Sequence, residues 1–348
     1  MDGPDWPAPV DVTAAPPPPP PPLTETEPGG VPALEAGDEQ PEAGVYSIGD
    51  RGQAADVEGT PAFVVGGQPD ALVDAGEVTG PDGAPSLAVR LASVRGAGHR
   101  YDGTPRQDDA GLAVAGPDGD WLVVAVADGV SAGARSHLAA RAAVRVGLKL
   151  LTGELAGGAD PAELDWEGLV GRLAGQVLLV ARRELGDDQL GARDAARTMA
   201  STVALAVVAT APDPGDGHHR AVVVPIGDTS AWVLRGGTAW EPITAVKNEG
   251  EAVASSATVA LPLLPAAIPV AAATFGPGDA LLVMSDGVGD PLGDGTGEAA
   301  ATLARWWADP PSRWAFASQV DFGRRSHSDD RSAVAVWPLG GVGGGPAR

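Results

Sequence analysis

The sequence has no cysteine and only two lysines among its 348 residues. The absence of cysteine excludes disulfides, thiolate zinc sites, iron–sulfur clusters and cysteine nucleophiles, and therefore also cysteine-dependent phosphatases and proteases. Neither lysine, Lys149 or Lys247, follows a glycine-rich loop of the Walker type, so a P-loop nucleotide enzyme is not expected. Basic residues number 23 against 46 acidic ones, a balance that argues against nucleic acid as a partner.

The sequence also lacks a convincing membrane or targeting segment. Residues 252–275 carry no charge, but three prolines and many small residues make them a poor continuous helix. We interpret this segment as a sheltered loop with short extended pieces. Residues 1–5 lack the basic and apolar regions of a secretory signal. We therefore expect a cytoplasmic protein with no membrane partner.

Composition divides the chain into three parts. Residues 1–86 hold 16 acidic residues and one basic residue, with seven consecutive prolines at 16–22. Such a segment buries too little apolar surface to offset the entropy of ordering it, so we expect a disordered, acidic, Pro/Gly-rich tail. Residues 339–348 are predicted to be a glycine-rich, flexible C-terminus. Residues 88–338 remain as one folded domain.

Within that domain, continuous apolar runs of strand length alternate with helical patterns. The runs indicate strands buried on both faces, and apolar residues at spacings of three to four indicate helices that present one stripe to a core. The strand-like runs are 121–127, 202–209, 221–226, 280–284 and 333–337, and the helical stretches are 134–151, 166–185 and about 298–307. This arrangement favours an α+β protein of two stacked sheets with helices outside.

Aspartates recur at the ends of these strand-like runs. Asp128, Asp228 and Asp286 follow three of the runs, the pair Asp329–Asp330 precedes a fourth, and the pair Asp108–Asp109 opens the domain. Each motif alone is typical of a turn. Together they suggest carboxylates gathered at one rim, where they would raise each other's pKa unless cations neutralised them. Oxygen ligands without cysteine select Mg²⁺ or Mn²⁺ over Zn²⁺ or copper.

These residues occur in motifs that resemble a known family. The motifs are VAVADGVS at 124–131, STVALAV at 201–207, PIGDTSAWVLR at 225–235, VMSDGVGDPL at 283–292 and SDDRSAVAVW at 328–337, preceded by His99 and Gln107–Asp108. In this order they resemble the metal-dependent serine/threonine protein phosphatases of type 2C, over nearly all of residues 88–338. The resemblance implies a four-layer α-β-β-α sandwich of two mostly antiparallel sheets. It also implies hydrolysis of phosphoserine and phosphothreonine by a metal-bridged hydroxide.

The resemblance also implies residue roles. Asp128 would bridge two Mn²⁺ or Mg²⁺ ions, and Gly129 would offer its carbonyl oxygen. Asp286 and Asp329 would complete one ion's ligands, and Asp108 would reach a metal through water. Asp228 would help to hold a third ion. Asp109 and Asp330 are the alternatives to Asp108 and Asp329, respectively.

The opening motif departs from many family members. Gly103 stands where they carry an arginine that grips the phosphate, and Gln107 stands where they carry a glutamate. The motif is closer to a bacterial subgroup in which Gly-x-x-His precedes Gln-Asp. We take Asp128, Asp286, His99 and Arg106 as the catalytic candidates, with Arg100 as a further candidate for gripping the phosphate. The general acid remains open, since His137, the nearest histidine after Asp128–Gly129, fits an ordinary helix position.

We therefore expect a monomeric protein phosphatase that acts on phosphoproteins and opposes a serine/threonine kinase. Two alternatives remain at this point. A catalytically weak or inactive module of the same fold would bind phosphoproteins or scaffold signalling partners, and the altered opening motif favours it mildly. An unrelated metal-dependent hydrolase would explain the carboxylates but not the order of the motifs.

Overall fold

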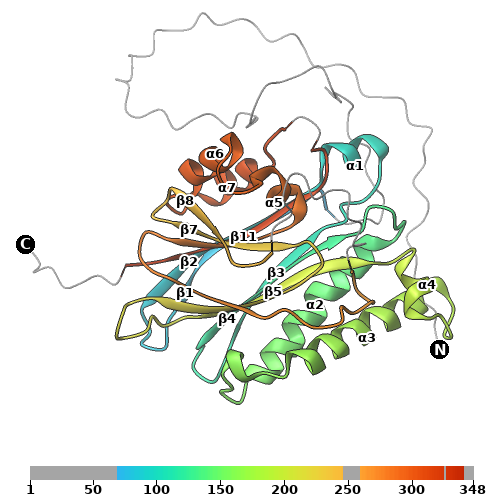
Figure 1. Ribbon diagram of the computed structural model, residues 1–348, viewed down its shortest axis with the longest axis horizontal. Coiled ribbons are helices and arrows are strands. Elements are labelled where there is room, and N and C mark those ends of the chain that lie inside the picture. Colours follow the sequence, from blue (N-terminus) through green and yellow to red (C-terminus); the bar gives the residue numbers. More distant parts are fainter. Residues whose placement is uncertain (1–68, 246–258, 325–326, 341–348) are drawn as a thin grey trace, which may run out of the picture. The chain divides into compact units, whose positions relative to one another are not determined.

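Two antiparallel sheets form the centre of the structure (Figure 1). The computed structural model describes residues 69–245, 259–324 and 327–340. The six-stranded sheet has the order β1 (Ala71–Thr79), β2 (Pro85–Val94), β11 (Arg331–Pro338), β10 (Ala280–Met284), β7 (Ser230–Arg235), β8 (Ala239–Pro242). The five-stranded sheet has the order β3 (Asp109–Ala115), β4 (Trp121–Gly129), β5 (Ser201–Ala209), β6 (His219–Ile226), β9 (Ala271–Phe275).

Helices cover the outer face of each sheet. On the five-stranded sheet lie α2 (Ser136–Leu155) and α3 (Trp166–Leu185), with a 3₁₀ turn at Pro161–Glu163 and the short α4 (Ala192–Ala196) nearby. On the six-stranded sheet lie α5 (Asp286–Leu292), α6 (Glu298–Trp307) and α7 (Arg313–Val320). The helix α1 (Ala97–Asp102) connects β2 to β3. The α-β-β-α sandwich implied by the sequence motifs is therefore confirmed.

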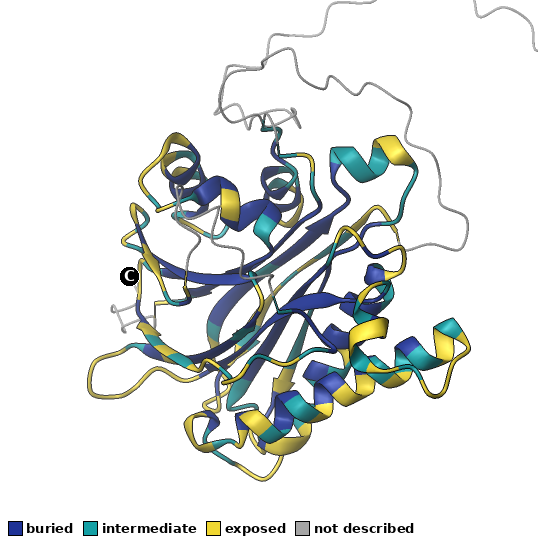
Figure 2. Cartoon of the chain, turned by 45° about the vertical axis from the view of Figure 1, so that its right-hand side comes forward, coloured by how far each residue is buried: buried dark blue, intermediate teal, exposed yellow. Residues whose placement is uncertain are grey.

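The core consists of three apolar clusters, one between the sheets and one under each helical layer. Strand β4 shows why its sequence is apolar throughout. Val123 and Ala125 face α2 and α3, whereas Leu122 and Val124 face the other sheet. Figure 2 shows the central strands as buried throughout. A strand between two apolar layers has no polar face, which explains why the period of two is absent from the sequence.

The predicted elements coincide with observed ones in the middle of both sheets. The five strand-like runs fall on β4, β5, β6, β10 and β11, and the three helical stretches fall on α2, α3 and α6. Six strands lie outside the predicted strand-like runs, namely β1, β2, β3, β7, β8 and β9. Of these, β1, β3, β8 and β9 lie at sheet edges. An edge strand is defined by backbone hydrogen bonds to a neighbour, so it does not need the apolar run on which the prediction relied.

The folded part begins earlier than the predicted boundary at residue 88. Strand β1 pairs with β2 along its whole length, and Asp70 forms a salt bridge of 2.8 Å with Arg95. Its sequence, ALVDAGEVT, contains acidic residues and glycine because much of the strand is exposed. Residues 1–68 and 341–348, where we predicted most of the tail and the flexible end, lie outside the described residues.

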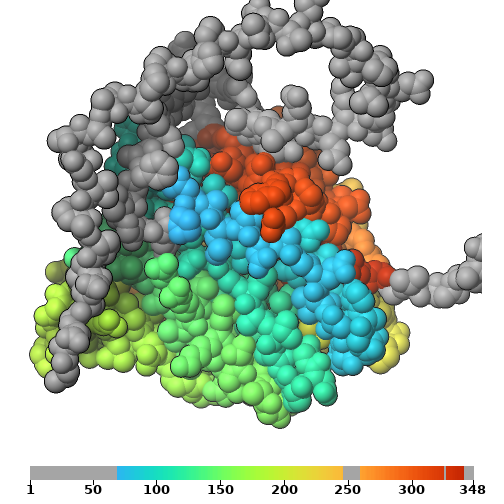
Figure 3. Space-filling model, turned by 180° about the vertical axis from the view of Figure 1, so that it is seen from behind, coloured from blue at the N-terminus to red at the C-terminus, as the bar shows by residue number. Residues whose placement is uncertain are grey.

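The uncharged segment 252–275 is described from residue 259 onward. Leu261 exchanges backbone hydrogen bonds with Ser201, and residues 271–275 form β9 at the edge of the five-stranded sheet. The short extended pieces predicted here are therefore present in the described part. None of the helices in the described ranges combines the length and apolar character needed to cross a bilayer. Figure 3 shows α2 and α3, in green, forming part of the outer surface beside β1 and β2 in blue.

Candidate metal centre

Five of the predicted aspartates lie where strands of the two sheets begin or end. Asp128 is near the end of β4, and Asp286 is the first residue of α5, directly after β10. Asp228 lies in the turn between β6 and β7, Asp329 precedes β11, and Asp108 precedes β3. These strands come from both sheets, so the site joins the two layers. We call this group of strand ends the rim.

Asp128, Asp228 and Asp286 form one carboxylate cluster at the rim. Each offers an oxygen atom, and these atoms all lie within 4.8 Å of one another. Asp128 is only 9% exposed. Burial, together with the charges of Asp108 and Asp286, raises the pKa of Asp128 well above its usual value. Burial is also the main cause that raises the pKa of Asp286 to about 6, and the charge of Asp228 adds to it.

Asp108 lies deeper than the cluster and is 1% exposed. Its pKa is raised well above the usual value, first by burial and then by the charge of Asp330, while hydrogen bonds with the side chains of Ser285 and Ser332 oppose the rise. Its Oδ2 atom has no hydrogen-bond partner among the described residues. A buried carboxylate oxygen without a partner is costly, and a nearby cation would remove that cost.

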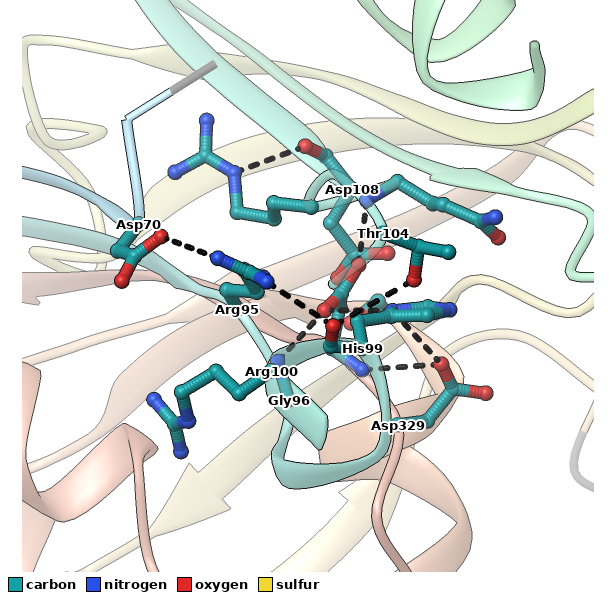
Figure 4. A network of polar contacts seen from close by, with 12 residues as sticks. Asp70, Arg95, Gly96, His99, Arg100, Thr104, Asp108 and Asp329 are labelled. Atoms are coloured by element: carbon teal, nitrogen blue, oxygen red, sulfur yellow. Dashed lines mark hydrogen bonds and ion pairs between the residues drawn. The ribbon is translucent and has the colours of Figure 1, made fainter. Parts of the chain in front are cut away.

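Asp329 and Asp330 differ sharply in their surroundings. Asp330 is almost fully buried, and its carboxylate accepts hydrogen bonds from the backbone N–H groups of Gly96, at 2.6 Å, and of Gln107. It also forms an ion pair of 2.9 Å with Nδ1 of His99. The side chain of Asp329 is 43% exposed and lies 4.0 Å from the same nitrogen (Figure 4). Asp330 is therefore occupied by the chain itself, whereas Asp329 remains available for an external ligand.

His99 belongs to this second group, because oxygen atoms of Asp329 and Asp330 and a ring nitrogen of His99 lie within 4.8 Å of one another. Burial by itself would lower the pKa of His99. The hydrogen bond to Asp330 and the charges of Asp330, Asp329 and Asp108 together outweigh burial and raise this pKa. His99 is therefore a cationic side chain at the rim over a wider pH range than a free histidine.

The rim surrounds an open cavity of about 460 Å³. Its wall combines residues of the predicted site with others that the sequence did not single out for it. The lining residues are Gly98, His99, Asp102, Ser131, Asp286, Gly287, Asp290, His327, Ser328 and Asp329. A cavity of this size with carboxylates and imidazoles on its wall can admit a small anionic group only if cations offset the negative charge.

Two glycines, Gly96 and Gly287, enclose the Asp329–Asp330 segment, and their role was not predicted from the sequence. A Cβ atom at Gly96 would lie 2.2 Å from the carbonyl carbon of Asp329. A Cβ atom at Gly287 would lie 1.9 Å from the carbonyl oxygen of Asp330. Both distances are far below any real contact, so a side chain at either position would displace the segment. The only visible signal was that both glycines stand inside the quoted motifs.

The position of Arg106 contradicts one prediction. It was a candidate for gripping the substrate phosphate, but it is 2% exposed. Its guanidinium donates hydrogen bonds to the backbone carbonyls of Ser93, at 2.8 Å, and of Asp108, at 3.2 Å, and lies 3.7 Å from Asp109. A buried guanidinium bound to backbone carbonyls stabilises the approach of β2 to β3 and does not reach the cavity.

The remaining candidates are located as follows. Arg100 forms an ion pair of 3.0 Å with Asp321, away from the carboxylate cluster. Asp109 faces Arg106, so the alternative that it replaces Asp108 is not favoured by the geometry. Gly129 is enclosed by the carbonyl oxygen of Gln107 and by Ser136, so a side chain would not fit there. His137 lies in α2, half-buried.

The donors at the rim fit a hard divalent cation. They are carboxylate oxygens without cysteine. One of them, on Asp108, is buried without a partner among the described residues, and burial and neighbouring negative charges raise the pKa values of Asp108, Asp128 and Asp286. Mg²⁺ and Mn²⁺ prefer such ligands. The residues therefore form a carboxylate cluster able to bind metal.

The raised pKa values predict that the metal stabilises the protein more at pH 7 than at pH 5. A folded state with raised carboxyl pKa values binds extra protons, so without metal its free energy of unfolding falls as the pH rises from about 4 to about 6, the window of Asp286. His99 acts in the same direction at higher pH, because its pKa is also raised. Mn²⁺ prefers the ionised carboxylates and reverses the loss.

Thermal unfolding at pH 5 and at pH 7, with EDTA and with millimolar Mn²⁺, tests this expectation. We expect the metal-free protein to melt at a lower temperature at pH 7 than at pH 5, and the increase caused by Mn²⁺ to be larger at pH 7. An increase of the same size at both pH values would contradict a carboxylate metal centre.

Comparisons with known proteins match this chain to a family profile and to solved structures. Residues 95–314 match the sequence profile of the family described as protein phosphatase 2C. A search of curated proteins finds no match. Among solved structures, a bacterial serine phosphatase has a TM-score of 0.50 at 14% identity, covering 73% of this chain and 98% of that chain.

Two further structures show the range of similarity. The phosphatase MsPP from Mycobacterium smegmatis, in complex with cacodylate, is 25% identical, with a TM-score of 0.43 over 74% of this chain and 100% of that chain. The catalytic domain of the serine/threonine phosphatase PstP, in complex with two manganese ions, is 17% identical, with a TM-score of 0.49 over 73% of this chain and 99% of that chain.

Proposed function

Since this chain belongs to the protein phosphatase 2C family, which it matches over more than half of its length, we propose that it removes phosphate from phosphoserine and phosphothreonine in proteins. The observation that carries the proposal is the carboxylate cluster of Asp128, Asp228 and Asp286 at the edge of an open cavity. The alternative of an inactive phosphoprotein-binding module is not favoured, because the carboxylates needed for metal are present and gathered.

We propose the following ligands for two Mn²⁺ or Mg²⁺ ions. Asp128 would be a ligand of both ions, and the carbonyl oxygen of Gly129 would be a further ligand. Asp286 and Asp329, which line the cavity, would complete the site, Asp108 would support it, and Asp228 would help to hold a third ion. When bound, divalent cations supply an activated water molecule near neutral pH and neutralise phosphoryl oxygens.

The chain itself prepares the cavity for a phosphate group. His99 is held in place by the buried carboxylate of Asp330 and forms part of the cavity wall, so it is placed to contact a phosphoryl oxygen. We assign to His99 the phosphate-gripping role for which His99, Arg100 and Arg106 were the candidates. The carboxylate of Asp330 accepts hydrogen bonds from the backbone just before α1 and just before β3. These bonds hold both segments next to Asp329.

The wider role is also a proposal. We propose a monomeric, cytoplasmic signalling enzyme that opposes a serine/threonine kinase. The acidic tail that the composition predicts would precede the folded domain and the glycine-rich end would follow it, with the N-terminal boundary moved to about residue 69 to include β1.

Metal-dependent hydrolysis tests the function directly. The full chain should hydrolyse p-nitrophenyl phosphate and a phosphothreonine peptide with Mn²⁺, and EDTA should abolish the activity, because the carboxylates alone provide no activated water. Phosphate release is the measurement. A correctly folded wild-type protein that stays inert across Mn²⁺ and Mg²⁺ titrations would favour the binding module instead.

A further inference from the structure

Three basic residues form a line along α2. Arg141, Arg145 and Lys149 are spaced four residues apart, so they lie above one another on the same face of the helix. Arg145 and Lys149 are exposed and Arg141 is half-buried. Within the described ranges, none of the three forms a salt bridge. We call these three residues the basic ridge.

The basic ridge is unusual for this chain. Acidic residues outnumber basic ones by 46 to 23, yet the only acidic residue in α2 is Glu154, which pairs with Arg172 of α3. A helix face that serves only to be solvated usually interleaves both signs, because oppositely charged pairs four residues apart stabilise the helix and like charges do not. Here the like charges follow one another without such compensation, so the ridge is not explained by the stability of α2.

The helix that carries the ridge begins beside the metal centre. The first residue of α2, Ser136, packs against Gly129, which follows Asp128. The charges of Arg141 and Arg145 act on the carboxyl of Asp109, which follows Asp108 and opens β3. Further along, Gly111 of β3 packs against Leu148 of α2. The ridge therefore follows the side of α2 that borders the edge strand β3, and it leads away from the rim.

We propose that the basic ridge binds an acidic segment of the phosphoprotein substrate, next to the phosphorylated residue; this inference rests on the proposed function. Arg141 and Lys149 are separated by two helical turns, about 12 Å, which is the length of about four residues of extended peptide. The strongly negative chain would otherwise repel such a segment. The ridge supplies local positive charge along the helix that begins next to Gly129, so it selects substrates with acidic flanks.

Matched phosphothreonine peptides test the ridge in the full chain with Mn²⁺ at low ionic strength. One pair carries four glutamates or four glutamines before the phosphothreonine, and a second pair carries them after it. The ridge variant combines Arg141→Gln, Arg145→Gln and Lys149→Gln. The control variant makes the same change in charge at exposed arginines on other helices, with Arg183→Gln, Arg305→Gln and Arg313→Gln.

We expect the wild-type KM to be about 5- to 10-fold lower for at least one glutamate peptide than for its glutamine partner, the effect of three exposed ion pairs. The ridge variant should lose this preference with kcat unchanged, and the control variant should keep it. Equal loss of the preference in both variants would overturn the proposal, because it would show only a general effect of net charge. A wild-type enzyme that does not distinguish the glutamate peptides from the glutamine peptides would overturn it as well.

A binding experiment tests this proposal independently of the proposed function. Fluorescence anisotropy with a labelled glutamate peptide that carries no phosphate measures docking without hydrolysis. Wild-type binding that the ridge variant loses would support the docking surface even if no substrate were hydrolysed, in which case the proposed function would fail alone. Tighter binding of duplex DNA than of the acidic peptide would show a general polyanion surface and overturn the substrate-docking proposal.

Discussion

Replacing Asp286 by asparagine is expected to reduce metal-dependent phosphatase activity by at least about 100-fold, because the change removes a carboxylate ligand of the metal cluster. The variant should still fold, and the free energy of unfolding of the metal-free protein should not fall. At pH 7 the Asp286 carboxylate is ionised although burial raises its pKa to about 6, and its neighbours in the cluster are also acidic. Removing this charge should stabilise the metal-free protein by about 1–2 kcal/mol.

Two measurements on the same preparations check this result, namely phosphate release with Mn²⁺ and urea unfolding with EDTA. Asp294→Asn is the matched control. Asp294 lies exposed just beyond the end of α5, and its carboxylate accepts hydrogen bonds from the backbone N–H and the hydroxyl group of Thr296. It should keep both the activity and the stability of the wild type. If Asp286→Asn retained full activity, or unfolded more easily than the wild type without metal, the carboxylate cluster would not be the metal centre.

Replacing Asp330 by alanine is expected to lower the free energy of unfolding by about 3–5 kcal/mol, because it leaves buried donors without an acceptor. The backbone N–H groups of Gly96 and Gln107 both donate to this carboxylate, and His99 pairs with it. Among the described residues, no other group accepts a hydrogen bond from those two N–H groups. The loss should also weaken Mn²⁺ binding, because Asp329 would no longer be held at the rim.

Urea unfolding and Mn²⁺ titration of the variant test this expectation. Asp188→Ala, in an exposed turn after α3, is the control and should change the free energy of unfolding by less than about 0.5 kcal/mol. Asp330→Ala with wild-type stability would show that water replaces the carboxylate, and the role assigned to Asp330 in shaping the rim would then be wrong.

The central strands and the carboxylates were visible in the sequence for a physical reason. A strand buried on both faces, such as β4, must be apolar along its length, and the chain must then turn at a polar residue, here Asp128. The same relation places Asp286 after β10. Repeated in order along the chain, these local patterns were enough to predict the family and the sandwich.

The edge strands and the structural role of Arg106 were not visible. Strand β1 depends on hydrogen bonds to β2, and its own sequence has the acidic residues and glycine of a tail. Arg106 stands beside the catalytic motif in sequence, but its guanidinium meets the backbone of Ser93, which lies on a different strand. Contacts with a neighbouring strand decide both features, and the local pattern of β1 or of the segment around Arg106 does not encode them.

By itself, the sequence determined which residue types were available for chemistry. Without cysteine, and with aspartates at the ends of apolar strands, it favoured oxygen-bound divalent cations and excluded thiol chemistry. Only the tertiary structure decided which carboxylates serve that chemistry. Asp329 and Asp330 are neighbours of the same type, but packing between Gly96 and Gly287 buries one against backbone donors and leaves the other facing the cavity. Burial and partners, which depend on the whole fold, set the role of each.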